Sequence, residues 1–169
     1  MEKGGFLGHA GAGAMTRYRT LLLISSIWGL CGCAGLSRTT ASLDPLSPQE
    51  HVTLGNSYLS HGEKGPAIQQ YQMALDEDRH YAPALIALGN AAYDAHDWQS
   101  SRTYFRRALK ALPGNVAVMN NLAMADVTEC KDLDHAQHLI DQALPNAGTL
   151  APYLLDTQAQ ITRCRSAKN

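Results

Sequence analysis

A repeated spacing of small and large residues constrains the fold of this chain more than any other feature of its sequence. Leu54, Leu88 and Leu122 are equally spaced, and each is followed directly by Gly or Ala. Tyr71 and Phe105 keep the same spacing. A fixed period of about 34 residues indicates stacked supersecondary units that bury a continuous core between neighbours. We therefore predict an all-α chain built from repeats, whose extended surface holds other proteins.

Three units follow from this period, at 48–81, 82–115 and 116–149. Each resembles the tetratricopeptide repeat (TPR), a helix-turn-helix unit of this length. The residues that carry the resemblance are Leu54, Gly55, Tyr58, Ala67, Tyr71 and Ala74 in the first unit; Leu88, Gly89, Phe105, Ala108 and Pro113 in the second, where Ser101 replaces the usual Ala; and Leu122, Ala123, Ala136, Ile140 and Ala143 in the third. The resemblance implies a right-handed superhelix of about three TPR units.

The third unit departs from the pattern in two ways. Its second helix arrives one residue late, and the spacing from Leu133 to Ala136 places the extra residue in the preceding turn. Asp126 stands where the first unit has Tyr58, so we expect looser packing there. Residues 150–164 form a further amphipathic segment, which we interpret as a terminal helix that covers the last repeat. The predicted TPR domain thus spans residues 48–164.

The segment before the repeats has the layout of an export signal. Arg17 and Arg19 precede a short apolar stretch at 21–30, which is too short to cross a bilayer as a helix. A basic region followed by a short apolar region is typical of a secretory signal peptide, here predicted over residues 1–32. Met15 begins a more compact version of this layout and is our candidate for the true initiator.

The end of this signal, Leu30-Cys31-Gly32-Cys33, resembles the lipobox of bacterial lipoproteins. The resemblance implies cleavage before Cys33, lipidation of that cysteine with acyl chains such as palmitate, and a flexible tether over 33–47. Since Ala34 and not Asp follows the cysteine, it also implies anchoring in the outer membrane. The alternatives are a signal that is cut elsewhere, an uncleaved anchor, or a cytoplasmic repeat protein.

Composition and motifs give little support to other functions. The formal net charge is −1 and the repeats carry no Lys/Arg cluster, which argues against nucleic-acid binding. No nucleophile or phosphate-binding motif occurs, so we expect no catalytic residue, no cofactor and no small-molecule substrate. His135 and His138 share one face of a predicted helix, where we expect solvent-exposed side chains and no metal site.

Two cysteines of the predicted domain are separated by about one repeat period. In an exported chain Cys130 and Cys164 would tend to pair, and the bridge would hold the terminal helix on the third repeat. The alternative is two unpaired thiols.

The predicted binding surface is the inner groove, lined by the first helix of each unit. Its candidate residues are Asn56, Leu59, Ile86, Asn90, Tyr93, Asn120, Asn121 and Met124. Asn side chains both donate and accept hydrogen bonds and can pair with the backbone of an extended peptide. Some members of the family grip a terminal carboxylate with Lys and Arg, but the corresponding positions here carry no cation: Val52, Asn56, Ala87, Ala117 and Asn121. A carboxylate clamp is therefore not expected, and simple helix packing or solvation is the alternative for these residues.

These features together predict a non-catalytic scaffold, anchored by lipid to the outer membrane with its domain in the periplasm. Its partner would be another envelope protein or a peptide segment of one. Assistance to pilus or secretion assembly is one role that analogy of fold and anchor suggests. The alternative is an accessory subunit that docks an envelope enzyme or a polysaccharide export machine.

Overall fold

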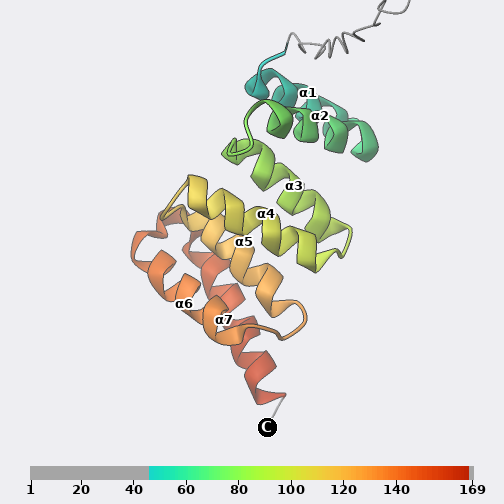
Figure 1. Cartoon of the computed structure of the whole chain (residues 1–169). Coiled ribbons are helices and arrows are strands. Elements are labelled where there is room, and N and C mark those ends of the chain that lie inside the picture. Colours follow the sequence, from blue (N-terminus) through green and yellow to red (C-terminus); the bar gives the residue numbers. More distant parts are fainter. Residues whose placement is uncertain (1–45, 168–169) are drawn as a thin grey trace, which may run out of the picture. The chain divides into compact units, whose positions relative to one another are not determined.

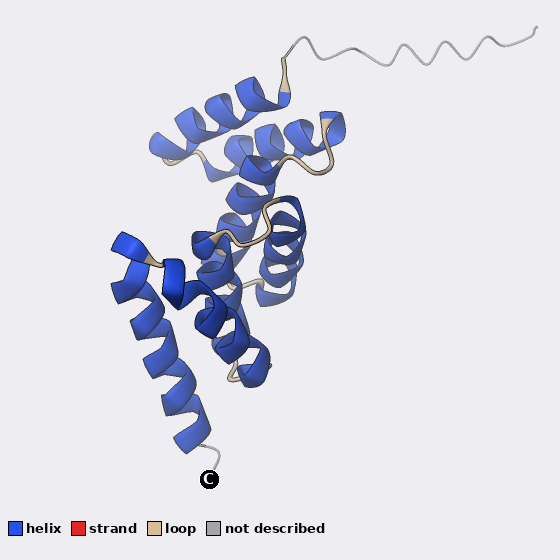
Figure 2. Ribbon diagram, turned by 90° about the vertical axis from the view of Figure 1, so that its left-hand side faces the viewer, coloured by secondary structure: helices blue, strands red, loops and turns tan. Residues whose placement is uncertain are grey.

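The computed structural model describes residues 46–167, and these form helices joined by short turns, with no strand among them (Figures 1 and 2). The signal peptide, Cys33 and all but the end of the predicted tether lie outside the described residues. The α-helices are α1 Pro48–Ser60, α2 Lys64–Glu77, α3 Ala82–Asp94, α4 Trp98–Ala111, α5 Val116–Val127, α6 Leu133–Ala143 and α7 Ala151–Ser166. Two 3₁₀ turns, Leu144–Asn146 and Gly148–Leu150, join α6 to α7. The all-α fold class is confirmed.

The helices α1, α4 and α5 begin at capping residues. Ser47 and Glu50 form a capping box at α1, in which the Glu50 N–H donates to Ser47 Oγ over 3.4 Å and the Ser47 N–H donates to Glu50 Oε2 over 2.8 Å. The hydrogen bond from the Ser47 backbone is the main reason why the pKa of the Glu50 carboxyl is lowered. Asp97 caps α4 by accepting from the Ser100 N–H over 3.1 Å, and Asn115 caps α5 in the same way.

Within each of the first two pairs, a glycine allows the helices to approach closely. A Cβ atom on Gly55 would lie 2.5 Å from Tyr71 Cε1, and one on Gly89 would lie 2.6 Å from Phe105 Cε1. Both aromatic rings are almost completely buried. The small residue of the repeat pattern therefore provides the space for the large residue of the facing helix.

The turn inside the third pair is longer than its two counterparts. Three residues separate α1 from α2 and α3 from α4, whereas residues 128–132 separate α5 from α6. Cys130 and Asp132 both have positive φ, at 49° and 46°, where the second turn has one such residue, His96. The turn is two residues longer than its counterparts, but α5 is one residue shorter than α1 and α3. The third unit is therefore longer by one residue up to the start of its second helix. The prediction that the extra residue lies in this turn is confirmed.

At Asp126, where looser packing is expected, polar contacts take the place of the aromatic ring. The Asp126 side chain is fully buried, its Oδ2 lies 2.7 Å from His135 Nδ1, and its Oδ1 lies 3.8 Å from Arg106 Nη2. Burial is the main reason why the pKa of the Asp126 carboxyl is raised. His135, expected to be only a solvent-exposed helix residue, is half-exposed and ties α6 to α5.

A second arginine of α4 also binds the end of α5. Arg102 is buried, and its Nη1 donates to the carbonyl oxygen of Ala125 over 3.1 Å, while its Nη2 lies 3.4 Å from Glu129 Oε2. A cation at the C-terminal end of a helix complements the carbonyl groups that lack partners there. The second and third pairs are thus joined by charged contacts as well as by the apolar core.

The terminal helix α7 covers the last pair. Leu154 and Ile161 are completely buried in the core that α5 and α6 share. Thr157, also buried, donates from its hydroxyl to Asn120 Oδ1 over 2.9 Å. The α7 helix therefore closes the apolar face that the third repeat would otherwise leave in water.

Candidate binding groove

Three hollows of the described domain share lining residues. The first, of about 210 Å³, lies between α1, α2 and α3, and the second, of about 100 Å³, between α3, α4 and α5. The third, of about 280 Å³, lies between α5 and the start of α7. Asn90 lines the first two hollows, and Asn121 and Met124 line the second and third. The three hollows are therefore neighbours along the surface from the first helix pair to the terminal helix, and we refer to them together as the groove.

Seven of the eight residues expected in the groove line these hollows. They are Asn56, Leu59, Asn90, Tyr93, Asn120, Asn121 and Met124. Ile86, the eighth, lines none of the three. It lies one helical turn before Asn90, and its side chain packs against the core of the first two pairs.

The asparagines of the groove differ in what they can offer a ligand. Asn56 Oδ1 accepts from the Tyr71 hydroxyl over 2.8 Å, and burial raises the pKa of that tyrosine. Asn121 Nδ2 donates to Asn90 Oδ1 over 3.3 Å, so these two amides bridge adjacent repeats. Each of these three amides keeps a polar atom without a hydrogen bond to the described residues, which leaves hydrogen-bonding capacity toward the groove.

Asn120 has a different role from the other three asparagines. It is 6% exposed, its Oδ1 accepts from Thr157, and its Nδ2 lies 3.5 Å from Met124 Sδ. Although Asn120 borders the third hollow, its amide serves mainly to hold α7 on α5.

The groove is nearly uncharged. Among the residues that line its three hollows, Lys64 and Asp94 alone carry charge, and both belong to the first hollow. Four of the five positions that could form a carboxylate clamp do border the groove, but they are alanines and asparagines: Asn56, Ala87, Ala117 and Asn121. The geometry therefore offers apolar surface and amide groups rather than a cluster of cations.

Large apolar side chains stand exposed at both ends of the groove. Leu59 on α1 is 47% exposed in the first hollow, and Tyr153 on α7 is 65% exposed in the third. Exposed apolar residues that coincide with a hollow mark an interaction site better than scattered ones do. Sequence reasoning missed Tyr153, as well as Lys64 and Ile68 of α2, because it assigned the groove to the first helix of each unit alone.

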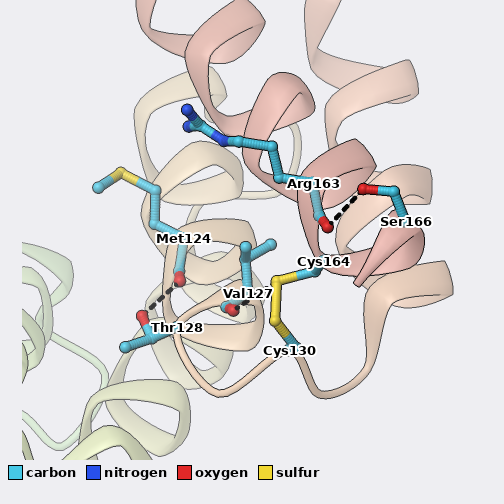
Figure 3. Close-up of a disulfide and its surroundings, with 7 residues drawn as sticks. All are labelled: Met124, Val127, Thr128, Cys130, Arg163, Cys164 and Ser166. Carbon is cyan, nitrogen blue, oxygen red and sulfur yellow. Dashed lines mark hydrogen bonds between the residues drawn. A yellow bond between two sulfur atoms is a disulfide. The ribbon is translucent and has the colours of Figure 1, made fainter. Parts of the chain in front are cut away.

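A disulfide secures the helix that forms the far end of the groove. Cys130, in the turn between α5 and α6, is bonded to Cys164 near the end of α7, with 5.4 Å between the two Cα atoms (Figure 3). This is the pair favoured by the separation of about one repeat period. Beside it, Arg165 Nη2 lies 2.8 Å from Asp134 Oδ1, a second link between α7 and α6. Both links restrain the position of α7 and hence of Tyr153.

Neither metal coordination nor a membrane span is indicated in the described part. Residues 46–167 contain no group of three or more His, Cys, Asp or Glu side chains arranged to hold a metal ion. Of the helices in the same range, none combines the length and the apolar character that a membrane span requires.

Comparison with known proteins identifies the fold of this helical stack. Residues 52–116 and 86–125 match the family model of the tetratricopeptide repeat. The described helix pairs have the helix-turn-helix architecture of this family. The repeat region is a TPR domain. Its recognition rests on both the repeated sequence pattern and the helical stack.

Solved TPR structures share this fold at low sequence identity. The first TPR of Spaghetti (RPAP3), bound to the HSP90 peptide SRMEEVD, superposes with a TM-score of 0.59 at 15% identity, over 71% of this chain and 91% of that one. The C-terminal TPR-containing domain of a Plasmodium falciparum putative FK506-binding protein gives 0.55 at 19%, over 73% and 93%. MamA gives 0.55 at 16%, over 74% and 82%. These likenesses show the fold alone.

Two curated relatives from Arabidopsis thaliana match part of the repeat region. ALBINO3-like protein 3, mitochondrial, is 34% identical over 71 residues, which cover 42% of this chain and 12% of the relative. ALBINO3-like protein 2, chloroplastic, is 32% identical over 73 residues, which cover 43% and 14%. The matched segment thus spans only a small part of either relative.

Proposed function

We propose that this TPR domain is a non-catalytic scaffold that holds an extended, largely uncharged segment of another protein in its groove. The observation that carries this proposal is the succession of three neighbouring hollows, of which the first two share Asn90 and the last two share Asn121 and Met124. A row of neighbouring hollows suits successive side chains of an extended segment.

The lining suggests how such a segment would be held. Backbone N–H and C=O groups of the bound chain would pair with the amides of Asn56, Asn90 and Asn121. Its apolar side chains would pack against the exposed Leu59 and Tyr153. Only part of the interaction energy appears as affinity, because an extended segment must be ordered on binding. We therefore expect dissociation constants on the order of micromolar, which corresponds to about 8 kcal/mol of binding free energy.

An uncharged groove also implies selectivity against acidic termini. The HSP90 peptide SRMEEVD, which is bound to the Spaghetti domain, contains three acidic side chains and a terminal carboxylate. In the groove described here, Lys64 is the single cation, and it shares its hollow with Asp94. We expect SRMEEVD to bind this chain poorly.

We further propose that the domain works in the bacterial envelope, anchored to the outer membrane through a lipidated Cys33. The support is the lipobox-like sequence after a basic and apolar segment, together with a Cys130–Cys164 disulfide of the kind that persists in oxidising compartments. A lipid-anchored scaffold of this kind would assist the assembly of an envelope machine such as a pilus or a secretion system.

The groove proposal is tested by partner purification with a pair of matched variants. Asn90→Asp adds one negative charge inside the groove with little change of shape, and its oxygen can still accept from Asn121. Gln72→Glu adds the same charge on an exposed part of α2 that lines none of the three hollows. A partner recovered with wild type and with Gln72→Glu but lost with Asn90→Asp supports the proposal. Equal recovery with both variants would contradict it.

The anchor is tested by the intact mass of the chain extracted from membranes, with and without reductant. A mass that corresponds to an acylated chain beginning at Cys33, and that gains two hydrogens on reduction, supports both lipidation and the disulfide. A mass without lipid would reject the anchor while leaving the groove proposal open to its own test.

A further inference from the structure

A second hollow of different chemistry lies outside the groove. It measures about 300 Å³ and is lined by Arg79, His80, Arg107 and Lys110. The first two residues belong to the turn between α2 and α3, and the other two lie one helical turn apart on α4. It shares no lining residue with the groove, so it is a separate feature of the domain.

One of these cations is held in place by the fold. Arg107 is half-buried, and its Nη2 donates to the carbonyl oxygen of Arg79 over 2.9 Å. Its guanidinium carbon lies 5.9 Å from the centre of the Tyr104 ring, within the range of a cation–π contact. Because the group is fixed before any ligand arrives, little side-chain entropy is lost when its remaining N–H groups bind an anion.

The cations of this hollow differ from most others in the domain by having no acidic partner. Within residues 46–167, no carboxylate forms an ion pair with Arg79, Arg107 or Lys110. The pairs that do form in this range involve other cations: Arg102 with Glu129, Arg106 with Asp126 and Asp132, Lys131 with Glu129, and Arg165 with Asp134. The same helix α4 thus directs its paired arginines toward α5 and its unpaired cations toward the α2–α3 turn.

An acidic run lies beside the hollow in sequence but does not line it. Residues 76–78 end and follow α2, and Asp78 Oδ1 accepts from the His80 backbone N–H over 2.9 Å. This contact uses only the backbone of His80, and the His80 ring has no hydrogen-bond partner among the described residues. Three permanent cations, Arg79, Arg107 and Lys110, line the hollow itself.

We propose that this hollow binds a phosphate group, either as a free anion or as the headgroup of an anionic membrane lipid. Arginine matches phosphate oxygens in a bidentate geometry, and lysine adds a point charge. Arg107 would provide the fixed contact, while Arg79 and Lys110, both exposed, would close on the anion. The proposal does not depend on the peptide groove.

The first arm of the test titrates the full chain with inorganic phosphate, and separately with chloride at the same ionic strength. Amide chemical shifts in NMR spectra are followed at residues around the hollow. We expect saturable shifts with phosphate alone. Equal effects of chloride would mean general screening and would overturn the proposal for a free anion.

The second arm measures sedimentation of the chain with phosphatidylcholine vesicles, with and without phosphatidylglycerol.

Both arms use variants that remove one charge each. Arg79→Gln and Lys110→Gln each remove the charge of a side chain that forms no ion pair in the described domain. Each should weaken binding about tenfold, which corresponds to the free energy of about one charge-assisted hydrogen bond. Arg163→Gln is the matched control, since it removes an exposed, unpaired cation from α7. Binding to phosphate identifies a free anion, and a variant-sensitive preference for phosphatidylglycerol alone identifies a lipid headgroup. The proposal fails if neither occurs, or if Arg163→Gln weakens binding as much as the other two.

Discussion

The close approach of α3 to α4 at Gly89 gives a quantitative prediction about stability. In Gly89→Ala, the added Cβ atom would lie 2.6, 2.7 and 3.0 Å from Cε1, Cδ1 and Cζ of Phe105. Ordinary contacts between carbon atoms are about 3.5–4.0 Å long, so the ring or a helix must move by about an ångström. Phe105 is 1% exposed, so a movement of its ring also disturbs the side chains packed around it.

Two opposing terms decide the size of the effect. Adding a methyl group to a closely packed core costs about 1–3 kcal/mol. Alanine in place of glycine inside a helix contributes up to about 1 kcal/mol in the other direction. We therefore expect Gly89→Ala to lower the free energy of unfolding by about 1–2 kcal/mol.

The chain offers a matched control for this substitution. Gly65 in α2 has no neighbouring atom within 4 Å of where a Cβ would lie, so Gly65→Ala should be neutral or stabilising by up to about 1 kcal/mol. Urea unfolding of the oxidised chain, followed by far-UV circular dichroism, measures both variants. In Gly89→Ala/Phe105→Leu, the smaller side chain should relieve the clash and give a favourable coupling energy. A Gly89→Ala variant as stable as Gly65→Ala would refute the packing argument.

Three further predictions concern the disulfide, a buried carboxyl and a helix cap. Replacing Cys130 and Cys164 by Ser opens a loop with a sequence separation of 34 residues. In the chain-entropy model this should lower the free energy of unfolding by about 4 kcal/mol, which urea unfolding measures. A loss below about 1 kcal/mol would contradict the prediction. Burial raises the folded pKa of Asp126, so its contribution to stability is complete below the unfolded pKa of about 3.9 and declines as the pH rises through the folded value. Asp126→Asn should remove that decline, and unfolding curves at a series of pH values check this; an unchanged pH profile would count against it. Asp97→Ala removes the acceptor of the Ser100 N–H and should cost about 1 kcal/mol in thermal or urea unfolding, whereas Asp97→Asn should cost clearly less.

The repeat pattern made much of the fold predictable. Each repeat uses the same small and large residues at the same spacing, so one unit predicts the next. The Gly55–Tyr71 and Gly89–Phe105 contacts are direct consequences of that pattern. The extra residue of the third unit could also be located, because the later apolar spacing resumes at Leu133.

The charged contacts could not be predicted in the same way. Arg102 and Arg106 lie on an apparently ordinary helix surface, and their partners belong to the next helix pair along the chain. Which of these side chains meet depends on where α4 crosses the end of α5, and the repeat period does not specify this. Asp126 illustrates the consequence, since the repeat pattern gave no sign of its contacts with His135 and Arg106.

The groove was predictable in part for a related reason. Positions one period apart, such as Asn56 and Asn90, share a face of the stack and could be placed from sequence. Tyr153 belongs to α7, which has no equivalent in the other units, so the period gives it no position. The basic hollow likewise joins residues 79–80 to residues 107 and 110, a pairing set by the fold rather than by the motif.

Site-specific photo-crosslinking in intact cells tests the central claim most directly. A photoreactive residue at position 124 lies where the second and third hollows meet, and one at position 72 lies on the exposed surface of α2. We predict one dominant crosslinked protein from position 124, absent from position 72 and lost when Asn90→Asp is combined with the probe. The same crosslinked proteins from both positions, or a crosslink from position 72 alone, would contradict the assignment of the groove as the binding site.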